Sequence, residues 1–233
     1  MMDQNLLCQI TVISDGPCKI RDPFVRVHSL PRIDKDFCWA DAINAGVCSA
    51  KSERLWYLDC DRILGRNTLT LANLLLSPGS MVYPHMHFHE VLRDDFSEDE
   101  LSELANCDLS QRPIYAEPQY YSRLRFEKKF VHKMTDSGKT PVSGCLFFCK
   151  EDYLKLGGFD PFYKGEGAFA DTDFHARCVD ANIDYKTMPD MEIHLHHAKR
   201  EIEQSNNGMF QLATENNKNY YLGKYFKEDF SSM

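Results

Sequence analysis

The stretch RLWYLDCD, residues 54–61, contains the strongest indication of the fold. Its first five residues are mainly apolar and aromatic, which is typical of a buried β-strand. Two carboxylates follow at Asp59 and Asp61, and in a continuing strand residues two apart lie on the same face. Such a pair favours a bound cation, and its hard oxygen ligands suit Mg²⁺ or Mn²⁺, ions that commonly also bind substrate phosphates. A solvated turn is the alternative, because D-x-D sequences arise readily by chance.

The residues before this strand predict an α/β unit. CQITVIS (8–14) is β-branched and apolar and ends at Asp15-Gly16-Pro17, FVRVHSL (24–30) alternates, and residues 38–50 carry apolar side chains at helical spacing. The order strand, strand, helix, strand with short links indicates parallel strands. Ligands of such sheets bind beyond the carboxyl ends of the strands, where Asp15 and the Asp59–Asp61 pair lie.

Further elements are predicted along the rest of the chain. Their patterns indicate helices at TLTLANLLL (68–76), EDYLKLGGF (151–159), DTDFHARCVDAN (171–182) and NKNYYLGKYFKE (217–228), and strands at MVYPHMHFHEVL (81–92), VSGCLFFCK (142–150) and MEIHLHH (191–197). The second of these helices ends at Gly157-Gly158, as glycine commonly ends a helix.

Histidines gather in two of the predicted strands. In the strand at 191–197 the alternation sets Glu192, His194 and His196 on a polar face, where imidazoles are good ligands for divalent metals; an exposed edge is the alternative. In the strand at 81–92 the residues His85, His87 and His89 alternate. Three histidines on one strand converge on a single transition metal only with a bend, which Pro84 could supply; an exposed strand is again the alternative.

Acidic residues open the helix at 171–182. Asp171 and Asp173 fall in its first turn, after a glycine-rich loop that can approach a ligand closely. Capping is the simpler explanation, since the helix dipole favours carboxylates at this end. The same residue type at the same place can also act as a general base.

Composition excludes several functional classes. The formal charge of −8 argues against a general nucleic-acid binder, which needs a basic face. The nine cysteines form no C-x-x-C pair, and the first residues lack the basic and apolar regions of a signal peptide. No stretch approaches the roughly 18–20 apolar residues of a membrane span. These features predict a cytoplasmic protein without an integral membrane segment and with reduced, mostly buried cysteines.

In this order the segments resemble the GT-A glycosyltransferases, in particular their family-2-like and galactosyltransferase C-terminal-like groups. The resemblance covers roughly residues 10–200 and rests on VISDG, WADAINAGVCSAKSERLWYLDCD, VSGCLFFCKEDYLKLGGFDPFYKGEGAFADTDFHAR and EIHLHH. It implies an α/β, Rossmann-like GT-A fold with a mixed, mostly parallel sheet flanked by helices. It also implies a single domain over 1–233, with a nucleotide-binding half at 1–80, an acceptor and catalytic half at 81–200 and a helical tail at 201–233.

The resemblance also implies roles for individual residues. Asp15 and Asn44 would contact the nucleoside, Asp59, Cys60 and Gly144 would lie along the donor, and Asp61 would hold Mn²⁺ or Mg²⁺ with Asp59, His194 and His196. The metal-binding histidine could be His194, His196 or His197. The strand alternation and the family's histidine spacing both select only His194. Asp171 is the implied catalytic base, because Ala170 stands where the family has a glutamate.

The function expected from these observations is hexosyl transfer. A metal-dependent glycosyltransferase would move a sugar from a nucleotide-sugar, expected to be UDP-linked, to a hydroxyl of a glycan or glycoconjugate acceptor. One alternative is a metallohydrolase or nucleotidyltransferase that uses His85, His87 and His89. The other is a non-catalytic GT-A relic that binds a sugar nucleotide, to which Ala170 gives some weight.

Overall fold

The computed structural model describes residues 9–21, 23–30, 39–60, 62–65, 67–92, 97, 99, 145–164, 169–196 and 207–225. Only the backbone is described for Asp15 and for residues 85–92, 187, 189–196 and 207–214. The chain forms two compact units. Unit 1 comprises Met1–Ser52, Tyr153–Arg177 and Glu201–Met233, and unit 2 comprises Glu53–Asp152 and Cys178–Arg200.

Unit 1 begins with a two-stranded parallel sheet. Strands β1 (Ile10–Asp15) and β2 (Val25–Leu30) pair from Ile10 opposite Val25 to Asp15 opposite Leu30. Helix α1 (Trp39–Ser49) packs on β1 with an apolar face that includes the buried Ile43 and Val47. The approach is close, because a Cβ on Gly46 would lie 3.1 Å from Cγ1 of Ile13.

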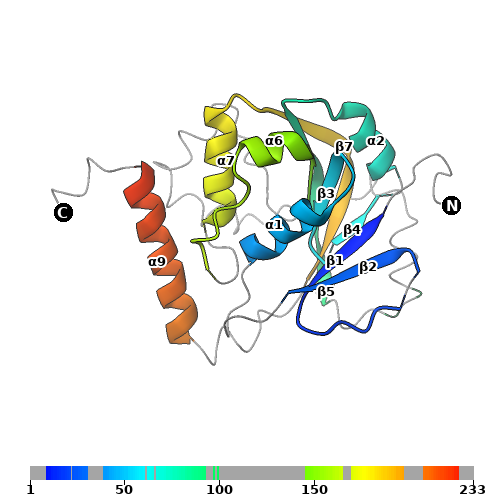
Figure 1. Cartoon of the computed structure of the whole chain (residues 1–233). Coiled ribbons are helices and arrows are strands. Elements are labelled where there is room, and N and C mark those ends of the chain that lie inside the picture. The colour runs from blue at the N-terminus through cyan, green and yellow to red at the C-terminus, as the bar shows by residue number, and fades with distance from the viewer. Residues whose placement is uncertain are drawn as a thin grey trace. The chain divides into compact units, whose positions relative to one another are not determined.

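Unit 2 is built on a five-stranded sheet with the strand order β3-β6-β5-β7-β4. Figure 1 labels β3, β4, β5 and β7 of this sheet. The strands are β3 (Arg54–Leu58), β4 (Arg62–Leu64), β5 (Ser80–Leu92), β6 (Cys145–Cys149) and β7 (Asp184–His196). Helix α2 (Thr68–Leu75) packs against β5 and β7. The core beneath it joins Ala72 and Leu76 to Val82, Cys145, Phe147 and Met188.

The predicted mixed α/β fold is confirmed, but the sheet is not mostly parallel. Strand β6 runs antiparallel to both β3 and β5, and β4 runs antiparallel to β7. Only β1–β2 and β5–β7 are parallel among the described pairs. The error has a physical cause: a buried strand such as CLFFC is apolar on both faces whichever way its neighbours run, so its sequence does not encode direction.

Most of the predicted helices and strands are confirmed where the structure describes them, but β4 was not predicted and β7 begins at Asp184, seven residues before the predicted start. The other helices in the described part of the chain are α6 (Lys150–Lys155), α7 (Ala170–Asp180) and α9 (Asn207–Tyr225). Helix α9 begins ten residues before the predicted start, in the segment NGMFQLATEN. None of the described helices is long and apolar enough to cross a membrane. The six described cysteines are free thiols, and of these Cys145 and Cys178 are buried, so the expected burial is not found for most of the described cysteines.

Two glycines end α6, and their environments differ. Gly157 and Gly158 have φ of 82° and 66°, and their N–H groups donate to the carbonyls of Leu154 and Tyr153 at 3.0 Å each. A Cβ on Gly158 would lie 2.5 Å from Oδ1 of Asn44 and 2.9 Å from Cε1 of Tyr153. A Cβ on Gly157 would meet nothing closer than the Arg177 guanidinium at 3.9 Å. Both positions require a left-handed backbone, and only Gly158 also requires the empty space.

We expect Gly158→Ala to lower the free energy of unfolding by about 2–5 kcal/mol, because it adds overpacking to the left-handed penalty. Gly157→Ala is the matched control, since it carries only the left-handed penalty of about 1–2 kcal/mol. Urea unfolding followed by circular dichroism measures both. Equal losses in the two variants would show that the space beside Gly158 is not needed.

Candidate functional site

The acidic segment of unit 2 forms a turn rather than the end of a strand. Strand β3 ends at Leu58, and the Arg62 N–H donates to the Asp59 carbonyl at 3.3 Å. The expected alternation through Asp61 therefore does not hold, because the chain leaves the sheet before Asp59. Asp61 lies outside the described residues, and Cys60 is an exposed free thiol.

The carboxylate of Asp59 already has partners within unit 2. Oδ1 accepts a hydrogen bond from the Tyr57 hydroxyl, and Oδ2 lies 3.8 Å from the Arg62 guanidinium, whose side chain is only 4% exposed. The nearby cation offsets the charge of Asp59. Asp59 therefore does not need a metal ion to balance its charge.

The strand that carries the later histidines runs beside this turn. Strand β4 starts at Arg62, directly after Asp61 in the sequence, and Arg62 pairs with His194 of β7. On the other side of β7, Phe88 of β5 pairs with His194, and His87 pairs with Ile193. In the strand order β5-β7-β4, His194 therefore lies on the strand next to β4, and the histidines of β5 lie one strand further away.

The residue types that the sequence implies for the metal, a carboxylate at Asp61 and imidazoles at His194 and His196, are kinds that can bind Mn²⁺. Among the residues whose side chains the structure describes, no three His, Cys, Asp or Glu residues gather in a metal-binding group. The metal-binding side chains proposed here lie outside that set.

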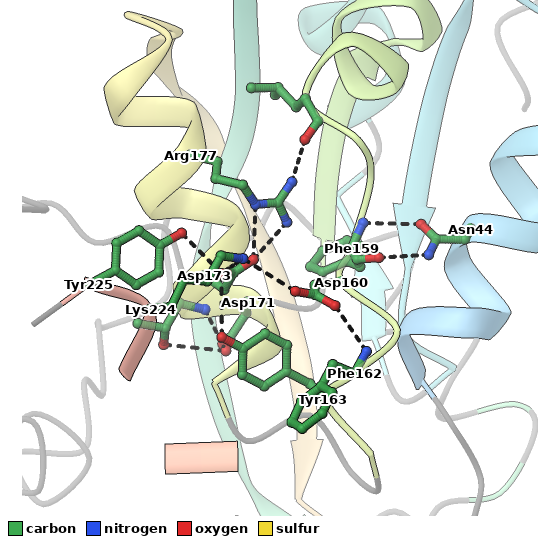
Figure 2. A network of polar contacts seen from close by, with 12 residues as sticks. Asn44, Phe159, Asp160, Phe162, Tyr163, Asp171, Asp173, Arg177, Lys224 and Tyr225 are labelled. Atoms are coloured by element: carbon green, nitrogen blue, oxygen red, sulfur yellow. Dashed lines mark hydrogen bonds and ion pairs between the residues drawn. The ribbon is translucent and has the colours of Figure 1, made fainter. Parts of the chain in front are cut away.

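Two predicted donor-binding residues lie in unit 1. Asp15 is the last residue of β1, and Gly16 follows it with φ of 103°. Asn44 of α1 donates through Nδ2 to the Phe159 carbonyl at 2.7 Å, and its Oδ1 accepts from the Phe159 N–H at 3.0 Å (Figure 2). The same Oδ1 accepts from the Tyr153 hydroxyl at 2.7 Å. Asn44 therefore holds the turn after Gly158, while its contact with a nucleoside stays a prediction. Gly144 lies outside the described residues.

The two aspartates in the first turn of α7 have different surroundings. Asp171 is partly exposed, and its Oδ1 accepts the Thr172 N–H at 2.8 Å. Asp173 is fully buried and paired with Arg177, whose Nε lies 2.9 Å and Nη2 2.8 Å from Oδ2, and with Lys224 of α9 at 2.6 Å (Figure 2). Asp173 is thus committed to structure, and of the two only Asp171 is open to solvent.

Tyrosine hydroxyls complete the shell around Asp173. Tyr225 donates to its Oδ1 at 3.0 Å and Tyr163 at 3.3 Å. Burial and then the charge of Asp173 raise the pKa of Tyr163, so its hydroxyl stays protonated and remains a donor. The sequence pattern missed this centre; the only local signal was Arg177, four residues after Asp173 on the same helix.

The loop from Phe159 to Lys164 is held at both ends by asparagine side chains. Asn44 binds both backbone groups of Phe159, and Asn217 of α9 binds both of Lys164, donating to its carbonyl at 2.9 Å and accepting from its N–H at 3.3 Å. Between them, Asp160 accepts from the Phe162 N–H at 2.9 Å. Burial alone would raise the pKa of Asp160, but this bond and those from Lys224 and Tyr220 lower it.

Comparison with known proteins supports the fold. The sequence matches no protein family and no curated protein. Among solved structures, the fold is similar to that of GalNAc-T7, whose crystal structure holds UDP, GalNAc and Mn²⁺, with a TM-score of 0.53 and 17% identity. The match covers 82% of this chain and 38% of that one, so the chain spans well under half the length of that protein. The likeness shows a GT-A-like fold, which confirms the predicted fold class.

The buried His175 of α7 makes the stability of the folded protein depend on pH. It is buried, and burial lowers its pKa to about 4 from 6.5. Between these values the unfolded chain takes up a proton that the folded chain does not, so stability is full above about pH 6.5 and falls as the pH approaches 4. We expect a loss on the order of 2–4 kcal/mol in unfolding free energy over this range from His175 alone.

Urea unfolding at several pH values tests this expectation with His175→Gln, which should flatten the slope between pH 6.5 and 4. His28→Gln is the control, because His28 is exposed on β2 and its removal should leave the slope unchanged. A native slope retained in His175→Gln would assign the acid sensitivity to other groups.

Proposed function

We propose that this chain is a metal-dependent glycosyltransferase. It would move a hexosyl group from a UDP-linked nucleotide-sugar to a hydroxyl of a glycan or glycoconjugate acceptor. The observation that carries the proposal is the GT-A-like fold together with the register of unit 2, in which the strand after the acidic turn pairs with the histidine strand at His194. The similar protein GalNAc-T7 was crystallised with a nucleotide, a sugar and Mn²⁺, which supports this choice of ligands.

We assign the roles in donor binding residue by residue. Asp15 and Asn44 would contact the nucleoside, and Asp59, Cys60 and Gly144 would lie along the ribose and sugar. Asp61 and His194 would hold the metal, with His196 beside them and Asp59 as a weaker partner, since Asp59 is already paired with Arg62. The ion, when bound, supplies Lewis-acid stabilisation of the charge that grows on the leaving diphosphate.

If the transfer inverts the anomeric configuration, Asp171 would act as its base. It would accept the proton of the acceptor hydroxyl as that oxygen attacks the anomeric carbon and the bond to the diphosphate breaks. Its partial exposure supports the assignment, because a base must reach a substrate from solvent. Asp173 is unsuited to this step, because it is buried and ion-paired with Lys224 and Arg177.

Replacing Asp61 tests the metal role. With Mn²⁺ and the nucleotide-sugar that most stabilises the native protein in a thermal-shift panel, Asp61→Asn should lower the release of nucleoside diphosphate by about 100-fold or more, because the ion loses its anionic ligand. Asp184→Asn is the matched control: Asp184 is an exposed aspartate of unit 2, and its loss should not change the rate. Normal Mn²⁺-dependent release by Asp61→Asn would remove the metal role. A native protein that binds the donor but never releases diphosphate would identify a binding module instead.

Replacing Asp171 tests the base. Asp171→Asn should lower the transfer rate by about 10²–10⁴-fold while the donor dissociation constant changes by less than about threefold, because proton transfer and not donor binding is lost. Asp180→Asn, an exposed aspartate at the other end of α7, serves as the control and should turn over normally. Normal transfer by a folded Asp171→Asn protein would rule this residue out.

A further inference from the structure

Within unit 1, helix α9 presents one face to the loop at Phe159–Lys164 and to the start of α7, which carries Asp171. From this face Asn217 binds the backbone of Lys164, Tyr220 donates to Asp160 at 3.0 Å, and Tyr225 donates to Asp173. Tyr220 also stacks on Phe162, with ring centroids 3.8 Å apart. These contacts join α9 both to the loop at Phe159–Lys164 and to the first turn of α7.

Lys224 is the residue of α9 that touches both. Its Nζ lies 2.6 Å from Oδ1 of Asp173 and 3.2 Å from Oδ2 of Asp160 (Figure 2). The Lys224 side chain is 31% exposed and Asp173 is 0% exposed, so at least one of these contacts is shielded from water. Burial alone would lower the pKa of Lys224, but Asp173 and then Asp160 raise it, so the lysine stays charged between them.

The charges in this cluster balance only when Lys224 is present. Asp160 and Asp173 carry two negative charges, and Lys224 and Arg177 carry two positive ones. Removing the lysine cation would leave the buried Asp173 carboxylate with Arg177 as its remaining cationic partner among these four. Taking one partner from a buried ion pair is costly because the other charge stays desolvated.

A second, independent feature shows that the start of α7 needs support. Phe169, directly before α7, has φ of 72°, which is unfavourable for a bulky residue. Its carbonyl accepts the Asp173 N–H at 2.9 Å, and its ring packs on Tyr221 of α9 with centroids 5.5 Å apart. Strained backbone persists only where its surroundings hold it, and it is common beside functional residues.

We propose that Lys224 is a positioning residue for the transfer reaction: by tying Asp160 to Asp173, it fixes the first turn of α7 and so the orientation of Asp171. This inference rests on the proposed function, in which Asp171 is the base. Lys224 does not touch the reacting atoms in this scheme. It acts through Asp173, two residues after Asp171 on the same turn.

Three variants of α9 separate positioning from general stability. Lys224→Met removes the bridge, Lys224→Arg keeps a cation that can reach both carboxylates, and Lys218→Met makes the same change at an exposed position of the same helix. All are measured at a temperature where each is fully folded by circular dichroism. The readouts are kcat and donor KM, together with amide hydrogen exchange in the first turn of α7.

We expect Lys224→Met to lower kcat by about 10–100-fold with donor KM changed less than about threefold, since a small misplacement of a reacting group costs rate rather than binding. Exchange in the first turn of α7 should speed up. Lys224→Arg should recover kcat to within about threefold, and Lys218→Met should match the native protein in every readout.

An unchanged kcat in folded Lys224→Met would overturn the proposal, and so would a loss that Lys224→Arg fails to recover. If Lys224→Met does not fold, Asp160→Asn decides by the same criterion, because it cuts the bridge at its more exposed end. A native protein without transfer activity would remove the proposed function and this inference together. Native activity with normal kcat in Lys224→Met would remove the inference alone.

Discussion

A carboxylate buried without water must find cations and hydrogen-bond donors inside the protein, and unit 1 is organised by this constraint at Asp173. The side chain is 0% exposed, and it draws partners from α7 itself, from the loop before it and from α9. Lys224 and Arg177 balance its charge, and two tyrosines donate to Oδ1. The position of α9 beside α7 follows from these contacts and from the aromatic rings packed around them.

The need to neutralise a buried carboxylate also bears on the two D-x-D segments, Asp171–Asp173 and Asp59–Asp61. At the start of α7, the buried Asp173 is neutralised by neighbours, and Asp171 is left partly exposed. In the turn after β3, Asp59 pairs with the almost fully buried Arg62. In each pair, the carboxylate with a protein cation beside it, Asp173 or Asp59, is thereby tied to the structure.

Much of the secondary structure could be predicted from the sequence, and less of the sheet. Apolar runs and periodicity locate β1, α1, β3 and α2, and the paired glycines mark the end of α6. The direction of β6 could not be predicted, because CLFFC would be equally buried among parallel or antiparallel neighbours. The prediction that the strand at 54–61 continues through its acidic residues was wrong for a different reason. The alternation of side chains does not show that the chain turns at Asp59 before β4 begins. The early start of α9 also lacked a local signal, since NGMFQLATEN has no strong apolar period.

The sequence by itself determined the local features of this protein: where strands and helices form, where glycine must end a helix, and which residue types could bind a metal or accept a proton. Periodicity, propensity and the demand for positive φ act over a few residues, so they can be read from neighbours in the chain. Only the tertiary structure decided which carboxylates are already neutralised. Lys224 lies 51 residues from Asp173, and Asn44 lies 115 residues from Phe159. The availability of a charged group depends on such distant partners, because burial and pairing are set by packing rather than by sequence position.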